Sequence, residues 1–597
     1  MHTSCRTPLC RASRSVLGLV AAFALIGCQE TALPTQPPAV PAPSASPADP
    51  VPVAATGDAE IAATIDQVLG AAAHPGLTWG AIPDVAPALK ALYEAEADRL
   101  LWFDGGRPIA VLAPALAAIA GAADHGLDPA DYDATLLAEQ WKALESGGGS
   151  GPELALFDLA TSIAAGRMLK AVHVGRVDPA TMLWGYDIAA KQFDLVAAFR
   201  QAREGRGLGD ALEALQPPFP HYRRARRMAA IYRDLATRGE PPMVPALART
   251  VRKVEPGASW DGVPQLAARL RVFGDLPAGA AVPESDPTRY DGPVVDAVKA
   301  FQRRHGLETD GVIGPGTIRA LNVSLAERIR QIELSMERMR WLPVLSERPN
   351  VFVNVALFRL WATDPTTGDE PLRMNVVVGE SLDHRTPIFV EQMEYVIFRP
   401  YWNPPRSIIT KEIVPRARRD PGYIARQQME IVASGADDAA ALPVTPENLD
   451  KVLSGRLFVR QKPGTHNSLG LAKFIFPNAE DVYMHGTPAQ SLFARARRDF
   501  SHGCIRLENP AQFASWVLRD QPEWTAERIQ KAMQAERPTR VNLKEKLTVV
   551  LFYATVHVNS EDEAFFVEDI YGHDKALDAA LAQGYPYPVK AEARPRT

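Results

Sequence analysis

Residues 484–506 of this chain read MHGTPAQSLFARARRDFSHGCIR, and this stretch carries the residues from which the chemistry of the C-terminal half can be inferred. A cysteine thiol is mostly protonated at neutral pH, so a nucleophilic Cys504 needs a neighbouring imidazole that takes its proton. His485 and His502 are the two candidates. Because Gly503 has no side chain, the backbone there can bend until adjacent amides point at one oxygen, and such amides form an oxyanion hole.

Two other interpretations of this stretch stay open. A lone cysteine is often an inert buried residue, and Cys504 could instead ligate zinc together with His485 and His502. A zinc site needs a fourth ligand or a metalloprotease motif, and the sequence contains neither, since His466 is typical of a loop histidine. The two histidines and the glycine beside Cys504 favour a nucleophile, and we expect no metal and no cofactor.

The four cysteines are unevenly distributed over the 597 residues. Cys5, Cys10 and Cys28 lie in the first 28 residues, where arginines precede an apolar run from 16 to 27. This pattern is typical of a secretory signal, and the run is too short to span a bilayer comfortably. The sequence LIGC at 25–28 resembles a bacterial lipobox, in which a peptidase cuts before the cysteine and its thiol receives a lipid. An ordinary signal peptide or an uncleaved anchor is the alternative.

The lipobox predicts a signal peptide over 1–27 and a lipidated Cys28. Gln29 resembles the outer-membrane address of Gram-negative lipoproteins, so the expected location is the periplasm, with a lipid anchor in the outer membrane. Residues 28–57 are rich in proline and alanine, and because proline recurs every few residues the segment cannot form a helix or bury a core, so we expect a tether there. The mature protein then has Cys504 as its single free thiol in an oxidising compartment, and no disulfide can form.

The chain is too long for one hydrophobic core, so roughly three or four domains are expected. The 65 basic and 70 acidic residues give a net charge of -5, which provides no positive field for nucleic acid. Between residues 58 and 250 apolar residues such as Leu112, Leu116 and Ile119 recur at helical spacing. We therefore predict a helical scaffold domain at 58–250 and no nucleic-acid partner.

Residues 251–322 have a second helical pattern. Val294, Val298 and Phe301 fall on one helical face, and Gly306 lies where that helix would end. Pro315 occupies a plausible first position of another short helix. The stretch 301–322 resembles the three-helix peptidoglycan-binding module, although a helical hairpin acting only as a spacer stays possible. A connecting helix is expected at 323–348.

From residue 349 the pattern changes to short β-branched runs, at 351–355 and 374–379, bounded by turn residues. Helical sequence interrupts this pattern at about 414–455, and an insertion of that length fits a cap over a site. Strand-like sequence resumes at 456–460 and at 547–553. We predict a β-rich domain over 349–575 with an inserted helical cap, followed by a C-terminal tail at 576–597. The predicted fold class is multidomain α+β.

The motifs HGT at 485–487 and SHGC at 501–504, with 19 positions from His485 to Cys504, resemble the signature of L,D-transpeptidase catalytic domains. Further segments, at 386–387, 400–405, 420–423 and 568–572, are similar to those of a large Gram-negative subgroup. In that subgroup a helical scaffold, a peptidoglycan-binding module and a catalytic domain with an inserted cap follow one another. The lipobox is a departure from many relatives.

The resemblance implies a role for each residue of the signature. Cys504 corresponds to the nucleophile, His485 to the general base, and the Gly486 carbonyl to the group that orients this base. The oxyanion would be held by backbone amides around His502, Gly503 and Cys504. Residues expected beside the substrate are Tyr483, Ser501 and Arg506. The arginine could contact a substrate carboxylate or form a structural ion pair.

The implied partners are peptidoglycan stem peptides. Cys504 would attack the carbonyl of the third stem residue and release D-Ala, and the side-chain amine of another stem would resolve the thioester into a 3-3 cross-link. If water resolves it, the enzyme is an L,D-carboxypeptidase; a relative that attaches or releases a lipoprotein is a further alternative. Carbapenem acylation of Cys504 is expected. The non-enzyme alternative is a cell-wall-binding scaffold.

Overall fold

The computed structural model describes residues 58–191, 193–280, 286–343, 348–382 and 384–587. The expected signal peptide, the lipidation site Cys28 and the tether lie outside these residues. Within the described ranges, no helix combines the length and the apolar character needed to cross a bilayer. The fold class is the expected mixture of helical regions and a β-rich C-terminal region.

The first region is helical. Its eight longer helices are α1 (Asp58–Ala71), α2 (Ala86–Ala95), α3 (Leu112–Ala120), α4 (Ala134–Gly147), α5 (Gly151–Val174), α6 (Leu195–Glu204), α7 (Leu208–Leu215) and α8 (Pro220–Thr237), counted among the described residues. α5 is buried along most of its length, so the other helices pack around it. It begins at a capping box, in which Ser150 and Glu153 satisfy each other's backbone amides.

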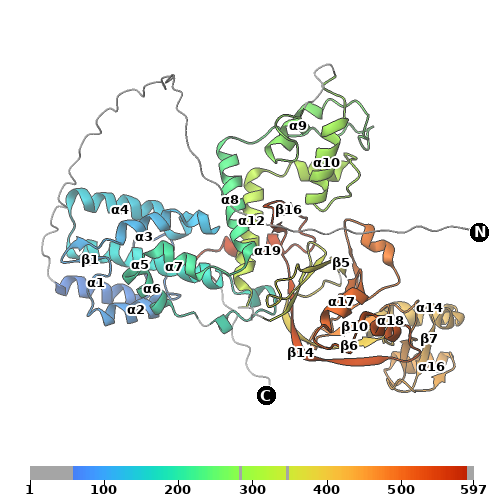
Figure 1. Cartoon of the computed structure of the whole chain (residues 1–597). Coiled ribbons are helices and arrows are strands. Elements are labelled where there is room, and N and C mark those ends of the chain that lie inside the picture. Colours follow the sequence, from blue (N-terminus) through green and yellow to red (C-terminus); the bar gives the residue numbers. More distant parts are fainter. Residues whose placement is uncertain (1–57, 192, 281–285, 344–347, 383, 588–597) are drawn as a thin grey trace, which may run out of the picture. The chain divides into compact units, whose positions relative to one another are not determined.

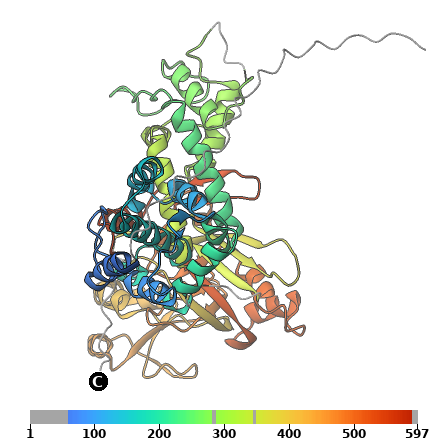
Figure 2. The ribbon, with the colours of Figure 1, turned by 90° about the vertical axis from the view of Figure 1, so that its left-hand side faces the viewer.

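A three-helix module follows, with α9 (Val263–Val272), α10 (Gly292–Arg304) and α11 (Pro315–Leu321) around a core of its own. The predicted helix limits are confirmed, because α10 ends two residues before Gly306, where φ is +62°, and α11 begins at Pro315. α12 (Leu325–Trp341) then packs along α8 (Figures 1 and 2). The buried Glu337 of α12 pairs with Arg176 of the helical region and with Arg340.

The C-terminal region is built on a sheet of nine strands in the described part of the chain, in the order β12-β5-β13-β11-β10-β6-β14-β3-β4. Their bounds are β3 (Asn350–Asn354), β4 (Arg359–Thr363), β5 (Leu372–Gly379), β6 (Val390–Phe398), β10 (Ala472–Ile475), β11 (Met484–His485), β12 (Asp499–Ser501), β13 (Ile505–Leu507) and β14 (Thr539–Phe552). β4 also pairs with β5, so the sheet closes on itself. β14 lies between β6 and β3, and the sheet is therefore completed late in the chain, as predicted.

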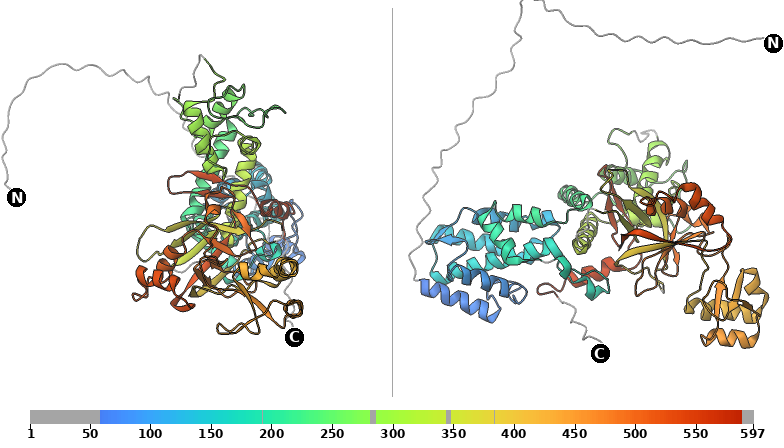
Figure 3. Two further views of the ribbon diagram at one scale, coloured as in Figure 1. Left: turned by 90° about the vertical axis from the view of Figure 1, so that its right-hand side faces the viewer. Right: turned by 60° about the horizontal axis from the view of Figure 1, so that its bottom comes forward.

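An insertion at 406–461 separates β6 from β10 and forms its own lobe, with its own apolar core (Figure 3). It contains α13 (Arg406–Ile408), a π-helical turn (Ile409–Ile413), α14 (Val414–Arg419), α15 (Gly422–Arg426), β7 (Met429–Val432), β8 (Ala441–Leu442), α16 (Pro446–Leu453) and β9 (Phe458–Gln461). The expected helices are present, but β8, β7 and β9 add a small sheet. The predicted strand-like stretch 456–460 overlaps β9, which pairs with β7 inside the insertion.

The last elements are α17 (Pro510–Val517), α18 (Ala526–Gln534), β15 (Val556–Val558), β16 (Ala564–Phe566) and α19 (His573–Leu581). The segment after α19 is packed rather than tail-like up to residue 587. The Tyr585 hydroxyl lies 3.2 Å from that of Tyr132, and the Arg167 guanidinium lies 4.5 Å from the Tyr585 ring centroid. The chain end therefore contributes to the core of the helical region.

Candidate active site

The strand register aligns three side chains across the sheet. β10 runs antiparallel to β11 and pairs Lys473 with His485, and β11 runs parallel to β13 and pairs His485 with Arg506. Residues directly opposite each other on neighbouring strands point to the same face of a sheet. Lys473, His485 and Arg506 therefore form one cross-strand row.

Cys504 lies on the same face as this row. Met484 and Ile505 are paired and have no exposed surface, so they point into the core. Because successive side chains alternate, their neighbours Tyr483 and Cys504 point to the opposite face. The Ile505 amide donates to the Tyr483 carbonyl at 3.1 Å, which keeps Tyr483 and Cys504 next to each other.

The Cys504 sulfur is half-buried, and its nearest polar contacts come from the segment before His485. Burial raises the pKa of the thiol; hydrogen bonds from the Tyr483 backbone and hydroxyl and the charges of Lys473 and Arg506 oppose that rise. A weak hydrogen bond joins the sulfur to the Asp481 carbonyl at 4.0 Å. Burial and the sulfur also raise the pKa of the Tyr483 hydroxyl, so it remains a donor.

His485 is held as a neutral ring. It is 5% exposed, and Nδ1 lies 2.5 Å from the Gly486 carbonyl. Burial, with a contribution from Arg506, lowers the pKa of His485 to about 3. Since a carbonyl only accepts, we assign the proton to Nδ1, which leaves Nε2 as a proton acceptor. A carbonyl at this place is the orienting group implied for Gly486.

Among the described residues, no hydrogen bond joins the His485 ring to the Cys504 sulfur. The two side chains share a face of the sheet, with the Tyr483 ring centroid 5.7 Å from that of His485. A ring with so low a pKa is neutral at pH 7 and cannot supply the positive charge of a thiolate-imidazolium pair. The geometry allows His485 to act as a base, but the charge that would stabilise an ionised sulfur must come from elsewhere.

The loop before Cys504 is held by side-chain hydrogen bonds. The Ser501 hydroxyl donates to the Cys504 carbonyl at 2.5 Å and accepts from the Gly503 amide at 3.2 Å. Gly503 has φ of +110°, a conformation that glycine adopts freely and other residues rarely do. The Gly503 amide was expected to contribute to the oxyanion hole, but in this structure it donates to the Ser501 hydroxyl within the loop.

A second set of bonds reaches this loop from the chain end. The Thr386 hydroxyl donates to the Gly503 carbonyl at 2.8 Å and accepts from the Gly379 amide at 2.9 Å. The Tyr571 hydroxyl accepts from the Thr386 amide at 3.1 Å and donates to the Gly379 carbonyl at 2.6 Å. The segments at 386–387 and 568–572, which the sequence marked only by resemblance, therefore meet beneath the motif.

His502 points away from the row and toward the insertion. Its Nε2 lies 3.3 Å from Oε1 of Glu412, in the π-helical turn, and its ring centroid lies 4.5 Å from that of His384. The insertion therefore contacts the motif two residues before Cys504. Among the described residues, no group of three or more His, Cys, Asp and Glu side chains is placed to hold a metal ion.

Comparison with protein-family models finds three domains along the chain. Residues 87–228 match a scaffold domain, residues 261–321 match the family described as "Putative peptidoglycan binding domain", and residues 348–541 match the L,D-transpeptidase catalytic domain. This last match covers the whole row of site residues. Residues 348–541 are an L,D-transpeptidase catalytic domain.

A Haemophilus influenzae protein named "Putative L,D-transpeptidase" is 29% identical over 252 residues, which cover 42% of this chain and 49% of that protein. The match thus spans about half the length of the relative. Among solved structures, the L,D-transpeptidase from Xylanimonas cellulosilytica is 16% identical, with 52% of this chain and 100% of that chain covered and a TM-score of 0.17. That superposition supports no conclusion about the fold.

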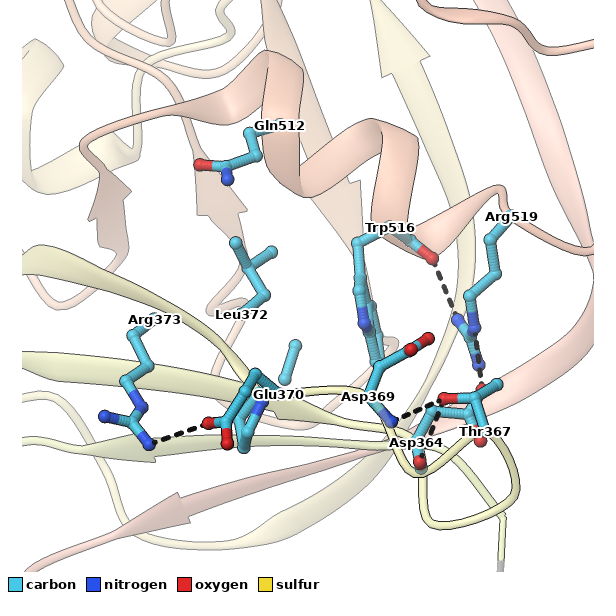
Figure 4. Close-up of a pocket in the computed structure, with 11 residues that line it drawn as sticks. Asp364, Thr367, Asp369, Glu370, Leu372, Arg373, Gln512, Trp516 and Arg519 are labelled. Atoms are coloured by element: carbon cyan, nitrogen blue, oxygen red, sulfur yellow. Dashed lines mark hydrogen bonds and ion pairs between the residues drawn. The ribbon is translucent and has the colours of Figure 1, made fainter. Parts of the chain in front are cut away.

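Two hollows lie outside the motif, one within the catalytic domain and one between this domain and the peptidoglycan-binding module. One, of about 440 Å³, lies between the β4–β5 connection and α17, where Asp369 lies beside Trp516 and Glu370 pairs with Arg373 (Figure 4). The other, of about 710 Å³, is lined by several arginines, among them Arg359 and Arg498. Neither is lined by a residue predicted for the site.

Sequence reasoning gave no role in this site to four residues, Lys473, Thr386, Tyr571 and Glu412, although it had marked the segments of Thr386 and Tyr571 by resemblance. Lys473 gave the clearest available signal, because it is the one charged residue of β10, which reads AKFI. A charged side chain in a short apolar strand indicates a specific role for that residue. The other three act through contacts between segments far apart in the sequence, for which the chain offers no local pattern.

Proposed function

We propose that this protein is an L,D-transpeptidase of the cell wall that uses Cys504 as its nucleophile and forms 3-3 cross-links between peptidoglycan stem peptides. The observation that carries the proposal is Cys504 on the same sheet face as His485, inside an L,D-transpeptidase catalytic domain. The scaffold and peptidoglycan-binding domains before it fit a wall substrate.

The first half of the reaction makes a thioester. The Cys504 sulfur attacks the carbonyl carbon of the third stem residue, and the thiol proton passes to Nε2 of His485. Collapse of the tetrahedral intermediate breaks the amide bond, and His485 returns the proton to the departing D-Ala nitrogen. Backbone amides at the loop stabilise the oxyanion, with the Cys504 amide as the nearest candidate.

The second half transfers the acyl group. The side-chain amine of a third residue on another stem attacks the thioester carbon and loses a proton to His485, and the carbon–sulfur bond then breaks. Attack by water in place of the amine gives an L,D-carboxypeptidase. The insertion at 406–461 supports transfer over hydrolysis, because a lobe that touches the motif can exclude water from the thioester. Attachment or release of a lipoprotein would be a third outcome of the same thioester.

The reaction is tested by incubating the full chain with a disaccharide-tetrapeptide and resolving the products by mass. A dimer that has lost one D-Ala supports the proposal, whereas tripeptide alone indicates a carboxypeptidase. Cys504→Ala should abolish the product and also carbapenem acylation, seen as a mass increase on the wild-type chain. If Cys504→Ala keeps wild-type activity, or if wall binding occurs with no product, the scaffold alternative replaces the enzyme.

The proposed location is the periplasm, with a lipid on Cys28 that anchors the protein in the outer membrane. Support comes from the lipobox-like LIGC at 25–28 and from Gln29 after it. Cys28→Ala should release the protein from the membrane fraction of cells. Recovery of the variant in the same membrane fraction as the wild type would contradict the anchor.

A further inference from the structure

An ionised sulfur on a protein is stabilised by a positive charge close to it. In this domain the neutral ring of His485 does not provide one. His502 points away from the row, and its Nε2 lies 3.3 Å from Oε1 of Glu412 in the insertion. The face of the sheet that carries Cys504 has two basic side chains within the row, Lys473 and Arg506.

Lys473 is positioned by both its strand and its neighbour. The residues on either side of it, Ala472 and Phe474, are fully buried, so alternation turns Lys473 toward the site. Its Nζ lies 3.8 Å from the centroid of the Tyr483 ring, a cation–π contact that holds the ammonium. The hydroxyl of that same Tyr483 hydrogen bonds to the Cys504 sulfur.

The Lys473 ammonium has few other interactions. Among the described residues, Lys473 forms no ion pair with a carboxylate. Burial lowers the pKa of Lys473, and the nearby Cys504 and Asp481 act against this effect. A half-buried cation without a carboxylate partner gains most from a negative charge that forms beside it.

Arg506 is the competing cation. It pairs with His485 across the strands, and its charge is a cause of the low pKa of that ring. Its effect on the thiol pKa is smaller than that of Lys473. Arg506 thus acts on both the base and the sulfur, whereas Lys473 is linked to the sulfur through the ring of Tyr483.

We infer that Lys473 is the residue that stabilises the ionised sulfur of Cys504, held in place by the ring of Tyr483, whose hydroxyl donates to the same sulfur. Lys473 therefore has a positioning and electrostatic role in the thioester reaction, in which it neither accepts nor donates a proton. The inference rests on the proposed function, in which Cys504 is the nucleophile.

The test measures the sulfur itself and needs no peptidoglycan. The full chain is alkylated with iodoacetamide at a series of pH values, and modification of Cys504 is followed by peptide mass spectrometry. Lys473→Met should move the apparent pKa of alkylation upward by about one unit, which makes alkylation about tenfold slower at a pH below both values. Lys473→Arg keeps the charge and should keep most of the wild-type profile.

Two further variants complete the design. Lys462→Met is the matched control, because Lys462 lies in the same domain, pairs with Glu430 and should leave the profile unchanged. Lys473→Gln replaces Lys473→Met if the latter does not fold. An unchanged apparent pKa in a folded, uncharged variant at position 473 overturns the inference. Alkylation does not depend on turnover. If Lys473→Met shifts the apparent pKa as expected but the wild-type chain forms no cross-links, only the proposed function is rejected.

Discussion

Oε1 of Glu412 lies 3.3 Å from Nε2 of His502, and this contact joins the insertion to the loop that carries Cys504. Both side chains keep more than a third of their surface exposed, at 36% and 37%, so solvent screens the interaction. Its contribution to holding the insertion against this loop is at most about 1 kcal/mol.

The contact with Glu412 can be tested by hydrogen exchange. Glu412→Gln should speed amide exchange across 406–461 by roughly twofold to fivefold, the factor that corresponds to less than about 1 kcal/mol. The sheet strands should exchange as in the wild type. Glu447→Gln, in α16 of the same insertion, is the control, and equal exchange in the two variants would show that the contact does not hold the lobe.

Gly503 should not tolerate a side chain, although there is room for one. A Cβ would lie 3.7 Å from the nearest atom, the Arg385 carbonyl oxygen, so Gly503→Ala causes no clash. The cost is the φ of +110°, which strains other residues by about 1–3 kcal/mol. We expect a folded variant with at least a tenfold lower rate of Cys504 acylation by a carbapenem. A rate equal to that of the wild type would mean that the loop conformation is not required.

Thr386 should matter through its hydroxyl group. Thr386→Val leaves the buried Gly503 carbonyl and the Gly379 amide without a partner, at a cost of about 1–3 kcal/mol each. The expected result is a lower melting temperature and a lower kcat with little change in KM. Thr386→Ser retains the hydroxyl and should recover most of both quantities. Failure of the serine variant to recover kcat would indicate that the methyl group, not the hydrogen bond, is important.

Acidification should destabilise the protein. Burial is the first cause of a low pKa in five histidines, to about 3 or 4, and these are His125, His221, His485, His557 and His573. Below pH 6.5 the unfolded chain binds protons that the folded chain does not, so the free energy of unfolding falls as the pH falls toward 4. Each such histidine can contribute up to about 1.4 kcal/mol per pH unit in this window.

Thermal unfolding between pH 7 and 4.5 checks this expectation. His557→Phe should flatten the dependence, because the His557 ring centroid lies 4.8 Å from that of His221 and both rings resist protonation. An exposed residue gives the control: His466→Phe should leave the slope unchanged. A melting temperature that stays constant over the range would contradict the assignment of these rings as neutral.

Much of the architecture could be predicted from local patterns. Helix periodicity with Gly306 and Pro315 gave the limits of α10 and α11, and the β-branched run at 547–553 identified the late strand. The strand-like stretch at 456–460 overlaps β9, but its pattern could not show whether the partner is β7 or the main sheet. The sequence pattern indicates that a strand exists, but tertiary packing determines which strand it pairs with.

The site residues that lie close together in the sequence could be predicted. The HGT and SHGC motifs identified Cys504, His485, Gly486 and Gly503, which the structure places on adjacent strands and one loop. Lys473 reaches the same face only because β10 pairs with β11, and Tyr571 reaches Thr386 across 185 positions. The low pKa of His485 could not be predicted from the sequence either, because it depends on burial of the ring in the folded sheet.

The position of β14 has a consequence for synthesis. Residues 539–552 lie between β6 and β3, so a chain that stops before residue 539 has a gap in the middle of its sheet, although it already contains Cys504. We expect such a truncated product to leave the thiol without an ordered neighbourhood, and thus to be inert toward wall peptides. Only a polypeptide that has left the ribosome nearly whole can become active.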